Sequence, residues 1–187
     1  METEKILKEL KTSMSKAVEH TQSEFSSLHT GKASTSMIEN LVADVYGSGM
    51  RIREIAAITT PDARTIQIQP WDKSSAQPIE KAILAANIGL TPVAQGMLIR
   101  CTIPEMSGER RKELVKVANA MAEEGRIAIR AIRRDSLETF KKLQKDGAIS
   151  EDDLKRFEKE VQKLTDNANS EIQKLLETKE KDLLKVS

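Results

Sequence analysis

Three stretches of this chain place apolar residues in alternating steps of three and four, the spacing that lines one face of an α-helix. The first spans residues 2–29, the second residues 107–145, and the third begins at a Ser150–Asp153 capping-box motif and contains neither Pro nor Gly. In the first and third stretches these positions are Leu7, Leu10, Met14, Val18, Thr21, Phe25 and Leu28, and Leu154, Phe157, Val161, Leu164, Ala168, Ile172, Leu175 and Leu183. Because each apolar seam is narrow, the sequence predicts an elongated antiparallel three-helix bundle.

The pattern changes between the first and second helical stretches. All five prolines and six of the eight glycines fall within residues 31–108. Apolar and polar residues alternate there in three short runs that predict strands, at residues 41–46, 65–69 and 97–103. Residues 76–87 read as one helix, with Pro78 in its first turn. The sequence therefore predicts an α+β protein: residues 1–30 and 107–187 form the bundle, and residues 31–106 form a small inserted β/α/β domain.

The chain crosses between these two predicted domains twice, at segments that we expect to act as hinges. The residues concerned are Thr30, Gly31, Lys32 and Ala33 at the first crossing, and Pro104, Glu105, Met106, Ser107 and Gly108 at the second. Two short crossings with Gly or Pro allow little rigid contact, so the pattern favours hinge motion. The alternative is a single rigid body with the domain packed on the bundle end.

Four arginines cluster on the second helical stretch: Arg126, Arg130, Arg133 and Arg134. At 100° per residue they share a sector about 100° wide, which also contains Lys112, Lys116 and Lys141. The apolar residues of that helix centre roughly 130° away and are Leu114, Ala118, Met121, Ala128, Ile132 and Leu143. The arginines are therefore expected to point outward, into solvent or onto a polyanion. Since only Glu123 interrupts the sector and unpaired like charges destabilise a helix, we favour the polyanion over a solvated face.

The charge distribution supports this interpretation although the net charge is only +1. Residues 110–142 contain ten Lys and Arg against five Asp and Glu, a balance of +5, whereas residues 146–187 contain eight against eleven, a balance of −3. A basic helix thus precedes an acidic one. Aromatic residues make up only 3% of the chain, which argues against base-stacking platforms.

The sequence offers no catalytic or cofactor-binding motif. His20 and His29 lie nine positions apart, which excludes a shared helix-face metal site, and the single Cys101 in a predicted strand is expected to be a buried hydrophobe. No phosphate-binding glycine loop or nucleophile elbow is present. We expect no enzyme, metal or cofactor, and no membrane association because no apolar run approaches about 20 residues. Trp71 is either an exposed binding residue or, as we favour, packed in the core or edge of the inserted domain.

Several motifs in one order resemble those of the ribosome recycling factor family over essentially the full length of the chain. They are Thr30-Gly31-Lys32-Ala33-Ser34; Val45-Tyr46-Gly47; Gly89-Leu90-Thr91-Pro92; Glu109-Arg110-Arg111-Lys112; the run from Arg126 to Asp135; and Ile149 to Asp153 with Gln162 to Asp166. The resemblance implies an L-shaped protein with a hinged small domain. It also implies binding to the ribosome after termination in the cytoplasm, and action with elongation factor G and GTP to split the subunits and release mRNA and tRNA.

Site residues follow from the same resemblance. The bundle is expected to dock on large-subunit ribosomal RNA through Arg130 and Arg133, supported by Arg126, Arg134 and Arg111, while elongation factor G pushes the hinged domain. Lys32 is a further expected RNA contact. The family usually has arginine on both sides of its Thr-Gly pair, where this chain has His29 and Lys32. Lysine keeps the charge but loses bidentate phosphate geometry.

Two other interpretations remain open at this point: a structural coiled-coil protein that dimerises, and a general RNA-binding protein without ribosome specificity. The inserted domain and the short helix–helix turn at Gly147 favour an intramolecular bundle, and hence a monomer, over the first. The second interpretation is disfavoured because aromatic residues are scarce and no RNA-module motif is present, which argues against recognition of an RNA sequence.

Overall fold

The computed structural model describes residues 1–185, which divide into two compact units. One unit, the bundle, contains Met1–His29 and the chain from Gly108 to Lys185. The other, the inserted domain, contains Thr30–Ser107. Each crossing between them lies one residue from the boundary that the sequence predicts. The α+β class is confirmed.

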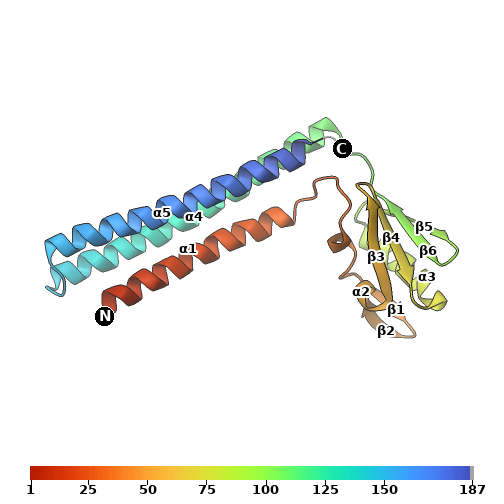
Figure 1. The fold of residues 1–187 in the computed structure, drawn as a ribbon, viewed down its shortest axis with the longest axis horizontal. Coiled ribbons are helices and arrows are strands. Elements are labelled where there is room, and N and C mark those ends of the chain that lie inside the picture. The colour runs from red at the N-terminus through yellow and green to blue at the C-terminus, as the bar shows by residue number, and fades with distance from the viewer. Residues whose placement is uncertain (186–187) are drawn as a thin grey trace. The chain divides into compact units, whose positions relative to one another are not determined.

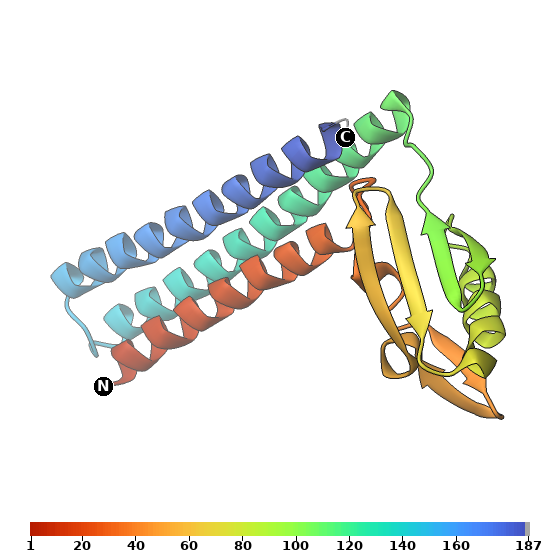
Figure 2. The same ribbon diagram turned by 45° about the vertical axis from the view of Figure 1, so that its right-hand side comes forward.

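The bundle consists of helices α1 (Glu2–Ser26), α4 (Gly108–Lys145) and α5 (Glu151–Leu184), which lie side by side (Figures 1 and 2). Helix α1 begins at the end of the bundle where α4 turns into α5, so it runs antiparallel to α4 (Figure 1). Gly147, with a φ of 80°, ends α4, and Ser150 caps α5. A positive φ at this position suits glycine because it has no Cβ to collide with the backbone.

Most of the predicted apolar seams of α1 and α5 are buried, with Leu10, Met14, Val18 and Phe25 on α1 and Phe157, Val161, Ala168 and Ile172 on α5. The other predicted leucines are only partly buried except Leu183, and next to Leu175 the buried residue is Leu176. On α4 the predicted seam is partly wrong. Ala128 is exposed, and the fully buried residue is its neighbour Ile129. The seam of α4 runs through small residues, Ala118, Ala122 and Gly125, because α4 packs against both other helices at once.

Gly125 marks a close approach of all three helices. A Cβ added to this residue would lie 2.4 Å from Thr21 Oγ1 on α1 and 3.0 Å from Ile172 Cδ1 on α5. The first distance is shorter than a non-bonded contact allows, so a side chain here would force Thr21 to move. A glycine inside a helix costs about 1 kcal/mol relative to alanine. The close packing of the bundle offsets that cost.

The inserted domain is built on a four-stranded antiparallel sheet in the order β3-β4-β6-β5. These strands are β3 (Ala56–Asp62), β4 (Thr65–Pro70), β5 (Thr91–Gln95) and β6 (Leu98–Thr102). Strands β1 (Val42–Val45) and β2 (Ser48–Arg51) form a separate hairpin, followed by the short helix α2 (Ile52–Ile55). Helix α3 (Ala76–Ala86) packs on β1 and β5, and the 3-10 turns Thr35–Met37 and Lys73–Ser75 complete the unit.

Strands β2, β3 and β5 and helix α2 are absent from the sequence prediction. Most residues of these three strands are exposed, so they lack the alternation of apolar and polar residues that reveals a half-buried strand. By contrast β4 and β6, which alternate clearly, contribute Ile66, Ile68, Ile99 and Cys101 to a core that α3 closes. The strands that the sequence predicts are those that build the core.

Cys101 is fully buried, which confirms its predicted role as a small hydrophobe. Burial, helped by the negative charge of Glu80, raises the pKa of its thiol to about 11, so the thiol stays protonated at neutral pH. The favoured interpretation of Trp71 is wrong: this side chain is 67% exposed and packs in no core.

Both ends of the inserted domain attach to its β3–β4 turn. The backbone N–H of Ala33 donates to the carbonyl of Ala63 over 2.7 Å, and that of Ile103 donates to the carbonyl of Arg64 over 2.8 Å. Ala33, which the sequence assigns to the hinge, is therefore held by the domain, and Gly108 is the first residue of α4. Between these points residues 30–32 and 104–107 have neither helix nor strand, and Gly31 has a φ of 83°.

The close approach at Gly125 predicts an energetic coupling. We expect Gly125→Ala and Thr21→Ala to be non-additive by about 1–2 kcal/mol, with the double variant more stable than the sum of the single effects, because Thr21→Ala removes the colliding oxygen. Urea unfolding of all four proteins measures this coupling. Thr12→Ala is the matched control, since Thr12 Oγ1 makes the same kind of bond to the carbonyl four residues earlier but is exposed. Coupling to Thr12 as large as that to Thr21 would contradict the packing argument.

The cap of α5 predicts a pH dependence. Ser150 Oγ accepts from the N–H of Asp153 over 3.1 Å, and the Asp153 carboxylate accepts from the N–H of Ser150 over 3.3 Å. The hydrogen bond from the Ser150 backbone lowers the pKa of Asp153 below 3.8. A lowered pKa stabilises the folded state above pH 3.8, and this contribution disappears as the pH falls through the folded-state value. Asp153→Asn should therefore destabilise the bundle at pH 7, and this effect should shrink as the pH falls through the folded-state pKa.

Thermal unfolding across this pH range tests the prediction. Asp152→Asn is the matched control. It removes the same charge from the same turn, but the Asp152 side chain makes no capping hydrogen bond in that turn. If both variants lose stability equally, the effect is one of helix-end charge and not of the cap.

Candidate nucleic-acid interface

Helix α4 carries a basic surface that we define as Arg126, Arg130, Arg133 and Arg134. The side chains of Arg130 and Arg134 are 60% and 69% exposed, respectively. They line a shallow depression together with Glu123, Ile127 and Ala131. Ile127 is 54% exposed, an unusual position for a large aliphatic residue amid charges. The depression thus combines two outward guanidinium groups with an apolar floor.

Arg126 and Arg130 share one carboxylate. Glu123 accepts from Arg126 Nη1 over 3.3 Å with one oxygen and from Arg130 Nη2 with the other. These hydrogen bonds, led by that of Arg126, lower the pKa of Glu123, which is therefore ionised at neutral pH. The premise that these two arginines are unpaired is wrong. The sequence argument counted Glu123 as a single interruption of the sector, whereas its two carboxylate oxygens pair with two arginines.

Two of the arginines are also linked to α5 through glutamines. Arg126 Nη2 donates to Gln173 Oε1 over 3.0 Å, and the amide of Gln173 donates to Glu177 over 3.1 Å. Arg133 Nε donates to Gln162 Oε1 over 3.0 Å, and the amide of Gln162 donates to Asp166 over 2.8 Å. Arg126 is only 29% exposed. The basic surface therefore extends from the outer face of α4 to its edge with α5, instead of lying wholly outward as predicted.

Arg111 does not belong to the basic surface, contrary to the sequence prediction. Its side chain is 6% exposed and donates to the carbonyls of Leu183 and Lys185 over 3.1 and 2.8 Å. The last turn of a helix leaves carbonyls without intrahelical partners, and a guanidinium group can bind two of them at once. Arg111 thus ties the start of α4 to the end of α5. Sequence position alone could not reveal this, because the partners lie more than 70 residues away.

Lys32, the remaining predicted RNA contact, is half-buried in the first crossing segment and belongs to the inserted domain. The structure therefore groups the four arginines of α4 within one unit and assigns Lys32 to the other.

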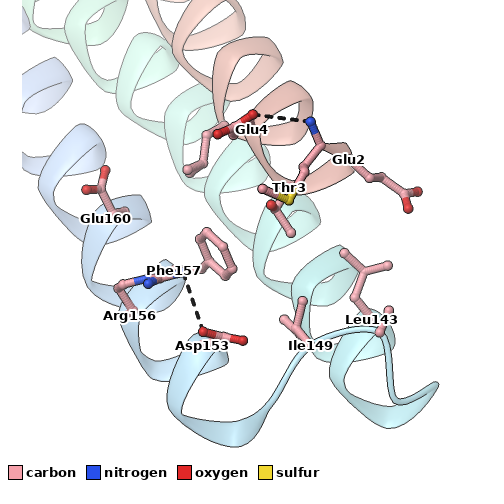
Figure 3. Close-up of a pocket in the computed structure, with 12 residues that line it drawn as sticks. Glu2, Thr3, Glu4, Leu143, Ile149, Asp153, Arg156, Phe157 and Glu160 are labelled. Carbon is pink, nitrogen blue, oxygen red and sulfur yellow. Dashed lines mark hydrogen bonds and ion pairs between the residues drawn. The ribbon is translucent and has the colours of Figure 1, made fainter.

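An open cleft of about 610 Å³ lies at the end of the bundle where α1 begins (Figure 3). Its apolar part includes Leu7, Leu143 and Phe157, and its charged residues are mostly acidic: Glu2, Glu4, Asp153 and Glu160. Arg156 pairs with Asp153 at 3.4 Å and covers the Phe157 ring (Figure 3). A rim of carboxylates repels phosphate, so this cleft is no candidate for nucleic acid. Among residues 1–185 no metal-binding group of His, Cys, Asp or Glu is found, and no helix could cross a membrane.

Sequence reasoning missed Gln162, Gln173 and Ile127. A signal for the glutamines was present. Each precedes an acid by four residues, and they lie eleven positions apart, which is close to three helical turns and places both pairs on one face of α5. Whether this face of α5 lies beside the arginines of α4 depends on how the two helices pack, and the sequence does not specify that packing.

The geometry can now be set beside known proteins. A family model described as ribosome recycling factor matches residues 21–184. A ribosome-recycling factor from Rhodopseudomonas palustris (strain HaA2) is 48% identical over 187 residues, and the match covers 100% of this chain and 100% of the relative. A solution structure of the ribosome recycling factor gives a TM-score of 0.77 at 40% identity and covers 100% of this chain and 99% of its own.

A second similar structure models the T. thermophilus ribosome recycling factor and the E. coli elongation factor G bound to the E. coli post-termination complex. Its TM-score is 0.63 at 38% identity, covering 98% of this chain and 99% of the other. Family model, relative and structures agree over most or all of the chain, and the motifs that first indicated the resemblance lie within the matched residues. The chain belongs to the ribosome recycling factor family.

Proposed function

We propose that this protein is a cytoplasmic, monomeric translation factor that disassembles the ribosomal complex left after termination. It acts together with elongation factor G and GTP, splits the subunits, and frees mRNA and tRNA for reuse. The observation that carries this proposal is the basic surface of α4, presented by a protein of the ribosome recycling factor family. The role is mechanical, and the protein itself catalyses no reaction.

The bundle binds ribosomal RNA of the large subunit through this surface. Arg130 and Arg134 are exposed enough to meet phosphates, and Arg133 keeps its terminal guanidinium nitrogens without a recorded partner among residues 1–185. Guanidinium groups bind phosphate in two-pronged fashion. Ile127 offers an apolar contact between them for a ribose or an unstacked base. Arg126, held by both Glu123 and Gln173, supports the surface more than it contacts RNA.

The inserted domain receives force from elongation factor G. Hydrogen bonds tie both its ends to the β3–β4 turn, so it can turn as one body about residues 30–32 and 104–107. A push on this domain then acts on a bundle that stays docked on RNA. This separation of docking from motion accounts for a two-unit design without any catalytic group.

The two kinds of arginine predict opposite phenotypes. Arg133→Ala should weaken ribosome binding more than any single substitution in residues 31–106, leave circular dichroism unchanged, and shallow the log-affinity versus log-salt slope by about 0.9, the value for one phosphate contact. Arg111→Met should lower the free energy of unfolding by about 2 kcal/mol, since two backbone carbonyls lose a charged donor held in a buried side chain, but leave the affinity of folded molecules intact. Co-sedimentation with vacant ribosomes across a salt series, paired with urea unfolding, measures both.

If Arg133→Ala unfolds the bundle while folded molecules bind ribosomes normally, the basic surface is structural and the proposed docking face is wrong. If Arg111→Met weakens binding by folded molecules, Arg111 contacts RNA despite its burial.

Hinge motion predicts that docking and recycling can be separated. A cysteine in the bundle and another in the inserted domain, at a pair of positions found by cysteine scanning, would lock the two units when oxidised. The native Cys101 is buried, and its high thiol pKa keeps it from interfering. The oxidised protein should co-sediment with ribosomes at near wild-type affinity but fail to split subunits when elongation factor G and GTP are supplied.

Reduction of the same sample is the matched control and should restore recycling. Gly31→Pro is a second, irreversible variant, because proline fixes φ near −65° and cannot adopt the 83° of Gly31. A locked protein that recycles at the normal rate would show that hinge motion is incidental.

A further inference from the structure

The polar contacts between α4 and α5 assign a role to a residue that no sequence feature singled out as a site. We propose that Gln162 is a positioning residue: it orients the Arg133 guanidinium toward an RNA phosphate without cancelling its charge. This inference rests on the proposed function, because it concerns how the docking face recognises phosphate.

The geometry fixes one edge of the guanidinium and leaves another open. Arg133 uses its Nε to donate to Gln162 Oε1 over 3.0 Å, and no other partner of Arg133 is recorded in the described part of the chain. The edge formed by the two terminal nitrogens stays available, and it is suited to two-pronged binding of a phosphate. Gln162 is held in turn, since its amide nitrogen donates to Asp166 over 2.8 Å. Arg133, Gln162 and Asp166 thus form a hydrogen-bonded series in which the amide stands between the guanidinium and the carboxylate.

An amide is the suitable group for this position. A carboxylate bonded directly to Arg133 would orient it equally well, but it would neutralise the positive charge that attracts a phosphate. Arg130 shows that alternative, because Glu123 binds its guanidinium directly. At Arg133 the neutral amide stands between the cation and Asp166, so the carboxylate orients the amide and not the arginine. The arginine is thereby ordered before binding, which reduces the conformational entropy lost on docking.

The same arrangement recurs one step along the helices. Arg126, seven residues and about 10 Å before Arg133 on α4, donates to Gln173, which donates to Glu177. Arg126 differs in that Glu123, which it shares with Arg130, also binds it and partly offsets its charge. Of the two arginines linked to glutamines, only Arg133 combines an ordered side chain with a charge that no carboxylate of residues 1–185 contacts. It is the position at which loss of the glutamine should affect RNA binding.

A double-mutant cycle tests the proposal. Gln162→Met keeps length and removes the acceptor; Gln162→Glu keeps the acceptor and adds the charge. Each is made in wild-type and Arg133→Ala backgrounds, and ribosome affinity is measured by co-sedimentation across a salt series. Gln162→Met should weaken binding roughly three- to tenfold, the range for one lost hydrogen bond, with an unchanged salt slope. Gln162→Glu should weaken binding and shallow the slope by about 0.9, as if one phosphate contact were lost.

Both effects should vanish in the Arg133→Ala background, because Gln162 acts through Arg133. Gln22→Glu makes the same charge change at an exposed position of α1, a helix without any of the four arginines, and should leave affinity unchanged. Circular dichroism and urea unfolding confirm that each variant is folded.

Three outcomes overturn the proposal. An effect of Gln162→Met that persists fully in the Arg133→Ala background would show that Gln162 contacts RNA or supports the bundle by itself. If Arg133→Ala weakens binding but neither Gln162 variant does, the positioning role is wrong while the proposed docking face stands. If Arg133→Ala itself leaves binding unchanged, the docking face and the positioning role fail together.

Discussion

The antiparallel register of α4 and α5 determines which side chains meet along the basic surface, and both ends of the helix pair hold that register. At one end Phe140 and Phe157 stack with ring centres 4.7 Å apart. At the other end Arg111 binds the carbonyls of Leu183 and Lys185. A shift of one helical turn, about 5.4 Å, would break both contacts and separate each arginine from its glutamine. The chemistry of the surface therefore depends on packing far from it.

The same residue type has opposite roles on α4, and burial decides between them. Arg111 is enclosed, and its charge is used on backbone carbonyls of the protein itself. Arg133 reaches the edge of the helix pair, and its contact is a neutral amide. Acids are abundant on α5, yet in both links to an arginine a glutamine separates the carboxylate from the guanidinium. A net charge of only +1 is thus compatible with a locally basic surface on one helix.

The sequence predicts well those features that depend on local periodicity. The three helices, their ends at Gly147 and Ser150, and the two alternating strands of the core all follow from the spacing of apolar residues. It fails where long-range packing decides. Ala128 and Ile129 are adjacent, and only the position of the two neighbouring helices determines which one is buried. Arg111 looks like a member of the arginine cluster until the end of α5 is placed beside it.

One buried cation and one partly buried cation anchor helix ends next to the two crossings. Lys179 on α5 donates to the carbonyl of Leu28, just before the first crossing, over 2.8 Å. Burial lowers the pKa of this lysine, as expected for an ammonium group drawn partly out of water to reach a backbone carbonyl. Arg111 fixes the start of α4 just after the second crossing. Since α1 and α4 are both anchored to α5 next to the crossings, the proposed hinge motion falls on residues 30–32 and 104–107, outside the anchored helices. All four arginines and the two linked glutamines belong to the bundle, so the geometry of the proposed docking face depends on no residue of the inserted domain.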